Sequence, residues 1–375
     1  MTATAFPPAT GGLGDESLQS VISSGLRAVF QPIVTLAEAG VVGYEALVRG
    51  PAGSTLELPH ALFGQAEAQG LRGIGREIKV FLEVTERALT LDPAGLLSAV
   101  EQLRGDGFGF ALDDVGADRR SLALLPLLRP DVVKLDVSLI QDHPSRASGE
   151  AMNGVCAYAE ATGAAVLAEG VEHERHVLAA QSLGATLAQR WHFGSPSALP
   201  IGSQIKRSTA MLGIAPRVVP HSPAQLVFAQ RGLRLGRKDV LLSVPRALEA
   251  QGSDLGEHAV VVANFQDVRH FTPTTRARFG QLAERVAFVA ALGAGMPDPP
   301  APAVRGANLA DDDVLLGEWD LTVLGPHFAA ALVARDLGDA GPDHDRRFAF
   351  VLTFDRNLVI EVAAALIAHV TGRRR

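Results

Sequence analysis

The chain has 375 residues, of which 47% are apolar and 20% are charged, a composition typical of globular protein with room for two domains. Its formal net charge is −7, and the only basic run is terminal, at 373–375, so we expect no duplex nucleic acid as a partner. The apolar stretch 359–370 contains Glu361 and His369 and is too short to span a bilayer, so we expect no membrane segment.

The chain contains one cysteine, Cys156, so no disulfide can form within it, and residues 1–20 lack the basic-then-apolar pattern of a secretion signal. Both features favour the reducing cytoplasm. Because Pro, Gly and Ser are frequent in residues 1–20, we expect this segment to form a disordered arm.

Residues 21–200 alternate short apolar runs with helical patterns. The runs are almost continuously apolar, which suits strands covered on both faces, and the alternation predicts a parallel, TIM-like β/α barrel. Helices are expected after Asp92-Pro93 and before the stop signals Gly163 and Gly184. The predicted strands are 28–34, 41–48, 80–84, 108–112, 132–135, 165–168 and 186–193.

A Pro-, Ser- and Gly-containing linker is expected over 201–222, followed by a smaller α/β (α+β) domain over 223–375. Apolar patterns in this domain predict strands, helices and one Gly/Ala/Pro-rich loop. The strands are expected at 260–265, 315–324 and 348–354, the helices at 279–289, 328–334 and 358–369, and the loop at 293–305.

Acidic residues follow the apolar runs of the predicted barrel, where the carboxyl ends of parallel strands form one catalytic face. So many converging acids with a single lysine favour Mg²⁺ or Mn²⁺ bound by hard oxygen ligands, in a site able to cleave phosphodiesters. The alternative for any single acid is a helix N-cap or a loop charge. The acidic residues are Glu45, Glu83, Glu86, Asp113, Asp114, Asp136, Glu169 and Glu172, and they are accompanied by Lys134 and Gln189.

These residues lie in motifs that resemble, in the same order, the EAL family of cyclic di-GMP phosphodiesterases. The resemblance implies a barrel that opens cyclic di-GMP to linear pGpG, and it suggests a homodimer. The matching segments are Gln31-Pro32-Ile33, Glu45-Ala46-Leu47-Val48-Arg49, Glu83-Val84-Thr85-Glu86, Asp113-Asp114-Val115-Gly116, Lys134-Leu135-Asp136, Ala168-Glu169-Gly170-Val171-Glu172 and Ala188-Gln189.

The same resemblance implies a role for each residue. Glu45, Glu83, Asp113, Asp114 and Gln189 would hold the metal. Glu169 would be the general base, Lys134 would orient water or phosphate, and Glu86 would hold the loop after the aspartate pair. The remaining residues, on the substrate side, would be Gln31, Arg49, Asp136 and Glu172, with Glu172 also supporting the base.

One departure from the family concerns a strand. Family members carry an Asn-bearing strand, itself a metal ligand, between the motifs of Glu45 and Glu83, but here Glu83 follows Glu45 by only 38 positions. The chain's asparagines all lie outside this interval. We therefore expect a barrel one strand short. Two hypotheses follow, a metal-dependent phosphodiesterase or an inactive barrel that senses cyclic di-GMP or scaffolds a partner.

The C-terminal part resembles the DICT sensory domain, whose ligand or partner the sequence does not identify. In this part Phe265 and Trp319 fit a core role better than stacking on a ligand. The matching segments are Ala263-Asn264-Phe265-Gln266-Asp267, Phe271-Thr272, Glu318-Trp319, Leu324-Gly325-Pro326 and Thr353-Phe354-Asp355-Arg356.

Overall fold

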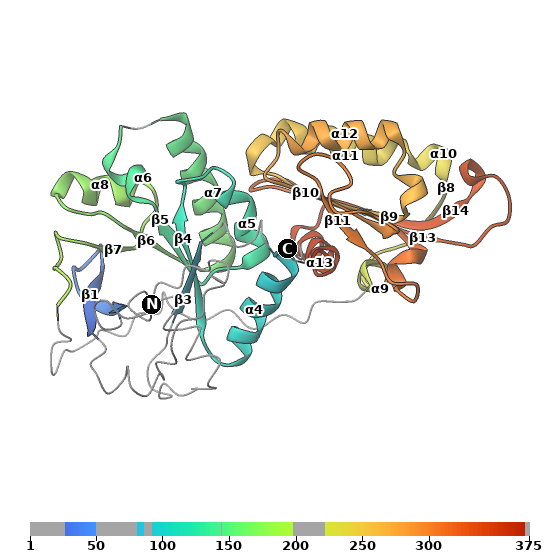
Figure 1. The fold of residues 1–375 in the computed structure, drawn as a ribbon. Helices are drawn as coiled ribbons and strands as arrows, with labels where there is room; N and C mark the ends of the chain where they lie inside the picture. Colours follow the sequence, from blue (N-terminus) through green and yellow to red (C-terminus); the bar gives the residue numbers. More distant parts are fainter. Residues whose placement is uncertain (1–26, 50–80, 86–91, 144, 198–221, 372–375) are drawn as a thin grey trace. The chain divides into compact units, whose positions relative to one another are not determined.

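A computed structural model describes residues 27–49, 81–85, 92–143, 145–197 and 222–371 (Figure 1). The expected arm over 1–20 and almost all of the expected linker lie outside these ranges. None of the helices within the described ranges is long and apolar enough to cross a bilayer. The chain divides into two compact units. The first contains Met1–Glu86, Leu103–Asp118 and Pro130–Ala215, and the second contains Arg87–Gln102, Arg119–Arg129 and Pro216–Arg375.

The first unit is built on a curled sheet of seven described strands, an incomplete β/α barrel with β2 and β3 at its edges (Figure 1). All seven predicted apolar runs are confirmed as strands. In sheet order these are β2 (Val41–Arg49), β1 (Arg27–Thr35), β7 (Leu187–Gln189), β6 (Ala165–Ala168), β5 (Val132–Leu135), β4 (Gly109–Val115) and β3 (Phe81–Thr85).

The expected parallel arrangement holds for β3 to β7 but is wrong for β1, which is antiparallel to both β2 and β7. Only residues 36–40 connect β1 to β2. A connection of this length can make a hairpin, whereas a parallel neighbour needs a crossover of a dozen or more residues.

The helices that follow the barrel strands begin and end where the sequence signals predict. Asp92 Oδ1 accepts a hydrogen bond from Gly95 N at 3.1 Å at the start of α4, and Gly163 ends α7 with a left-handed φ of 74°. The described helices in this part of the sequence are α4 (Pro93–Gly105), α5 (Ser121–Leu128), α6 (Val137–Gln141), α7 (Arg146–Thr162) and α8 (Glu174–Ser182). Of these, α5 and most of α4 belong to the second compact unit.

The second unit contains a mixed sheet in which β9, β10 and β11 are parallel and the other pairings are antiparallel. Helices α11 (Ser243–Leu255) and α12 (Pro273–Ala283) lie over one face, and α9 (Pro223–Phe228) and α13 (Arg356–Ile367) over the other (Figure 1). The sheet order is β11 (Arg305–Asn308), β10 (Phe288–Ala294), β9 (Val260–Asp267), β12 (Glu318–Leu324), β13 (Ala329–Asp336), β14 (Arg347–Thr353) and β8 (Arg234–Arg237).

Three expectations for this unit are wrong. Residues 328–334 were expected to be helical but belong largely to β13, an interior strand of the sheet. The helix expected over 279–289 ends at Ala283, and the loop expected over 293–305 begins inside β10. Residues 329–334 are all buried, so this apolar run carries no period that separates a buried strand from a buried helix. The expected strands 260–265, 315–324 and 348–354 and the C-terminal helix are confirmed within a few residues.

Candidate metal-binding active site

Lys134 lies at the centre of a group of four carboxylates contributed by four different strands or strand ends. Its side chain is 2% exposed, and its Nζ atom lies 2.8 Å from Glu169 Oε1 and 3.0 Å from both Glu83 Oε1 and Asp113 Oδ1. Glu45 Oε1 lies 3.6 Å away. The structure therefore brings together the lysine and four acids that are spread over more than a hundred positions of the sequence.

Gln189 and Gln31 join the acids on the antiparallel side of the sheet. Gln31 pairs with Glu45 across β1 and β2. Gln189 Nε2 donates to Gln31 Oε1 at 3.1 Å and also to Glu45 Oε2. Both amide hydrogens of Gln189 are thereby engaged, which leaves its Oε1 atom as the free end of the amide.

An apolar layer supports this polar cluster from inside the curled sheet. Successive side chains of a strand alternate between faces, so the residue two positions before each polar residue shares its face. Two positions before Asp113 on β4, Lys134 on β5 and Gln189 on β7 lie Ala111, Val132 and Leu187. All three belong to one buried apolar cluster. On the antiparallel β1 the supporting residue is Ile33, two positions after Gln31 instead of before it.

Asp113 and Asp114 are neighbours in sequence, so a regular strand would point them to opposite faces. The pairing of β4 with β5 is interrupted between Leu112 and Val115, and Asp114 has a left-handed φ of 56°, which Asp tolerates better than most residues. A bulge of this kind re-aims side chains beside functional sites. As a result, carboxylate oxygens of Asp113, Asp114 and Glu169 all lie within 4.8 Å of one another.

Burial and mutual repulsion shift the pKa values within the cluster. Burial raises the pKa of Glu83 to about 7, with Asp113 and Glu45 adding to the rise and Lys134 opposing it. The pKa of Glu169 is also raised, mainly by burial. Burial alone would lower the pKa of Lys134, but the four carboxylates hold it well above its ordinary value. One ammonium group therefore does not balance the negative charge gathered here.

The donor set fits a divalent cation. Among the described side chains, Glu83 Oε2 and Gln189 Oε1 are buried oxygens without a hydrogen-bond partner, and such orphaned oxygens cost free energy unless something binds them. The surrounding ligands are carboxylate oxygens, which Mg²⁺ and Mn²⁺ prefer over nitrogen and sulfur. A cation would also supply the positive charge that Lys134 alone does not provide.

Four predicted site residues are not placed in this cluster. The carboxylate of Asp136 caps α6 and accepts from Ser138 N at 2.9 Å, which is the capping role that the sequence left open. Glu172 is exposed. Among the described contacts of Lys134, none is with Asp136 or Glu172. Glu86 and the side chain of Arg49 lie outside the described part of the structure.

Gly170 follows the candidate base directly and is expected to be intolerant of a side chain. Its φ of 72° is left-handed, and an added Cβ would overlap the side chain of Val137. We expect Gly170→Ala to lower the free energy of unfolding by at least about 1 kcal/mol and to displace Glu169. Chemical denaturation measures the first effect, and any enzymatic turnover reports the second.

Gly149 provides the matched control for this substitution. It lies within α7, and an added Cβ would meet nothing within 4 Å. Because alanine is a better helix former than glycine, Gly149→Ala should raise the free energy of unfolding by up to about 1 kcal/mol. Equal effects of the two substitutions would contradict the proposed constraint at Gly170.

Two domain families match separate parts of the chain. The EAL domain matches residues 71–196, and DICT, described as a sensory domain in diguanylate cyclases and two-component systems, matches residues 225–337. The EAL match covers Glu83 and the later cluster residues but begins after Glu45.

Individual relatives match the same barrel region. The cyclic di-GMP phosphodiesterase RocR of Pseudomonas aeruginosa is 31% identical over 144 residues, which are 37% of this chain and 37% of RocR. An uncharacterized protein of Mycobacterium tuberculosis is 28% identical over 233 residues, covering 46% of this chain and 75% of that protein. The crystal structure of the EAL domain of Mycobacterium smegmatis DcpA shares 25% identity with a TM-score of 0.37, covering 46% of this chain and 92% of that domain.

Proposed function

We propose that the barrel unit is a metal-dependent phosphodiesterase that hydrolyses cyclic di-GMP to linear pGpG. The observation that carries this proposal is the buried carboxylate cluster around Lys134, with Nζ–O distances of 2.8–3.6 Å. The substrate is inferred from the EAL match and from the similarity to RocR, of which this chain spans only 37%.

Glu45, Glu83, Asp113, Asp114 and Gln189 would hold Mg²⁺ or Mn²⁺. When bound, the cation would offset charge on the phosphate and favour ionisation of the attacking water. Glu83 Oε2 and Gln189 Oε1, which have neither a hydrogen-bond partner nor a contact with Lys134, are the atoms we expect to gain a partner.

Glu169 is the proposed general base. It accepts a proton from water as the water oxygen attacks phosphorus, one P–O ester bond of the ring breaks, and the leaving oxygen gains a proton. The raised pKa of Glu169, caused mainly by burial, brings its basicity closer to the neutral range where proton transfer is efficient. Lys134 contacts Glu169 at 2.8 Å and holds the carboxylate in place while stabilising negative charge on the phosphate.

We further propose that the C-terminal unit regulates the barrel and that the chain acts in the cytoplasm, where its single cysteine stays reduced. Gln31 and Arg49 would contact the dinucleotide, Arg49 through a phosphate oxygen. Asp136 and Glu172 would act from the rim of the site, and Glu86 would hold the loop after the aspartate pair. A homodimer is proposed by family analogy alone.

A second candidate function is a barrel that binds cyclic di-GMP without cleaving it. It is favoured by the short interval of 38 positions between Glu45 and Glu83, which contains no asparagine. The alignment with the Mycobacterium tuberculosis protein runs over 233 positions but contains only 46% of this 375-residue chain. Some aligned positions therefore have no counterpart in this chain, which agrees with a shortened barrel. A lost metal ligand would weaken metal binding and remove most of the rate.

Hydrolysis in the presence and absence of metal separates the two candidates. We expect the full chain with excess Mn²⁺ to convert cyclic di-GMP to pGpG, and a chelator to abolish product formation because the acids then lack their counter-charge. Chromatographic separation of the nucleotides provides the measurement. Saturable nucleotide binding with no pGpG would overturn the enzyme and favour the sensor.

A further inference from the structure

The C-terminal unit contains a cavity of about 320 Å³ that the barrel chemistry does not use. It lies between the start of α12, helices α10 (Lys238–Leu241) and α11, and the sheet residues that face them. Its volume is at the lower end of the range of small-molecule sites. This size suits one ring system with a small substituent better than a dinucleotide with two bases.

Part of the cavity lining is apolar and aromatic. Trp319 on β12 and Phe265 on β9 both line the cavity, together with Leu242 and Pro245. Trp319 is held by an edge-to-face contact with Phe348 at a centroid distance of 5.5 Å, and Phe265 is held similarly by Phe271 and Phe279. The two rings are therefore fixed before any ligand enters, as planar recognition requires.

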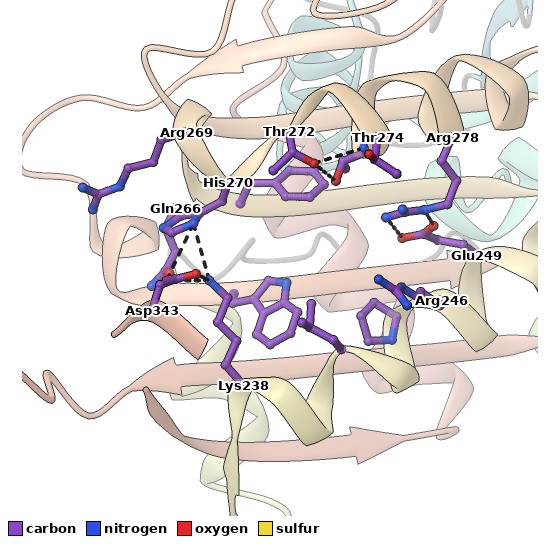
Figure 2. A pocket seen from close by; sticks show the side chains of 15 residues that line it. Lys238, Arg246, Glu249, Gln266, Arg269, His270, Thr272, Thr274, Arg278 and Asp343 are labelled. Atoms are coloured by element: carbon purple, nitrogen blue, oxygen red, sulfur yellow. Dashed lines mark hydrogen bonds and ion pairs between the residues drawn. The ribbon is translucent and has the colours of Figure 1, made fainter. Parts of the chain in front are cut away.

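The two ends of the cavity are charged (Figure 2). At one end Lys238 Nζ lies 2.5 Å from Asp343 Oδ2. At the other end Arg278 donates to the buried carboxylate of Glu249, and Arg246 lies beside this pair (Figure 2). The positive charges of the lining exceed the negative ones, since Lys238, Arg246, Arg269 and Arg278 face only Glu249 and Asp343.

This excess lies on the arginines. Lys238 pairs with Asp343 and Arg278 with Glu249, so both lining carboxylates are engaged. Arg246 and Arg269 are exposed. Arg269 pairs with Asp267, which does not line the cavity, at 3.8 Å, whereas Arg246 shares the single carboxylate of Glu249 with Arg278. Of these two, Arg246 lies at the same end as the Arg278–Glu249 pair, where two guanidinium groups can converge on one anion.

We propose that this cavity is the sensory ligand site of the C-terminal unit and binds a compound with one planar ring system and one anionic group, a carboxylate or a phosphate. The ring packs against Trp319 and Phe265, which line the cavity from the neighbouring strands β12 and β9, and the anion lies beside Arg246 and Arg278. This site is separate from the Lys134 cluster, so it stands whether or not the barrel is an enzyme.

Tryptophan fluorescence tests the proposal in the full chain. The sequence has two tryptophans, and Trp191→Phe leaves Trp319, in the cavity lining, as the single reporter. The variant is titrated with guanosine monophosphate and with benzoate. The neutral partners, guanosine and benzamide, and inorganic phosphate are titrated in parallel.

We expect a saturable change with at least one ring-bearing anion and roughly tenfold weaker binding of its neutral partner, because a charge-assisted hydrogen bond is lost. Arg246→Gln should weaken binding of that anion by roughly fivefold or more. Arg276→Gln is the matched control, since Arg276 is an exposed α12 residue that does not line the cavity. Which anion binds shows whether the ligand is a nucleotide or a carboxylic acid.

The proposal is overturned if neither anion gives a saturable change, or if the neutral partners bind as tightly. It is also overturned if Arg246→Gln and Arg276→Gln have equal effects. Inorganic phosphate binding as tightly as the ring-bearing anions would remove the role of the aromatic rings. Because the readout is binding at Trp319, failure here is distinguishable from failure of the barrel to cleave cyclic di-GMP.

Discussion

Glu169→Gln should lower the turnover of cyclic di-GMP by about 10²–10⁴-fold while leaving its affinity nearly unchanged. The substitution keeps the size of the side chain and an oxygen that can accept from Lys134, which lies 2.8 Å from Glu169 Oε1 in the native protein. It removes the ability to take a proton from water. The turnover rate and the dissociation constant of the nucleotide are measured separately on the same preparation.

Glu174→Gln is the matched control. Glu174 opens α8, its side chain is 78% exposed, and its nearest described partner is His192 at 3.8 Å. Its substitution should leave turnover within about twofold, as expected for a solvated surface charge. Comparable losses in both variants, or loss of nucleotide affinity with Glu169→Gln, would contradict the assignment of Glu169 as the base.

Lys134→Met should be among the most destabilising single substitutions in the barrel. The substitution removes the cation from a buried ion cluster and leaves the acids uncompensated, which costs about 3–5 kcal/mol in comparable cases. The four carboxylates around Lys134 already include one, Glu83, whose pKa burial raises to about 7 even with the lysine present. Unfolding followed by circular dichroism without metal measures the loss.

Divalent metal and an exposed ion pair provide the two controls for this variant. Mn²⁺ should restore part of the lost stability, because a bound cation replaces the missing charge. Arg146→Met removes a cation of similar size from an exposed pair with Glu150, where the arginine is 92% exposed, and should change the stability by no more than about 0.5 kcal/mol. If the Lys134→Met chain were as stable as the Arg146→Met chain, the claim that Lys134 compensates the buried carboxylates would be refuted.

The strands of the barrel could be predicted from the sequence because each is a short, nearly continuous apolar run. The same property misled the prediction at β13, where a run of six buried residues carries no helical or strand period. The antiparallel direction of β1 was predictable in principle from the short connection 36–40. A connection of this length favours a hairpin.

Most of the candidate site could also be predicted, since Glu45, Glu83, Asp113, Lys134, Glu169 and Gln189 converge as expected. The position of Asp114 could not be, because it depends on a bulge and a left-handed φ of 56°. The cavity beside Trp319 was missed for a different reason. Its lining comes from distant segments of the chain, and no local spacing brings those segments together.

Anomalous diffraction from crystals grown with Mn²⁺ and cyclic di-GMP tests the central claim most directly. The claim is that the carboxylate cluster around Lys134 is a divalent cation site. We predict at least one manganese peak in contact with carboxylate oxygens of Glu83 and Asp113. Nucleotide in the barrel with no manganese peak among these acids would contradict the account.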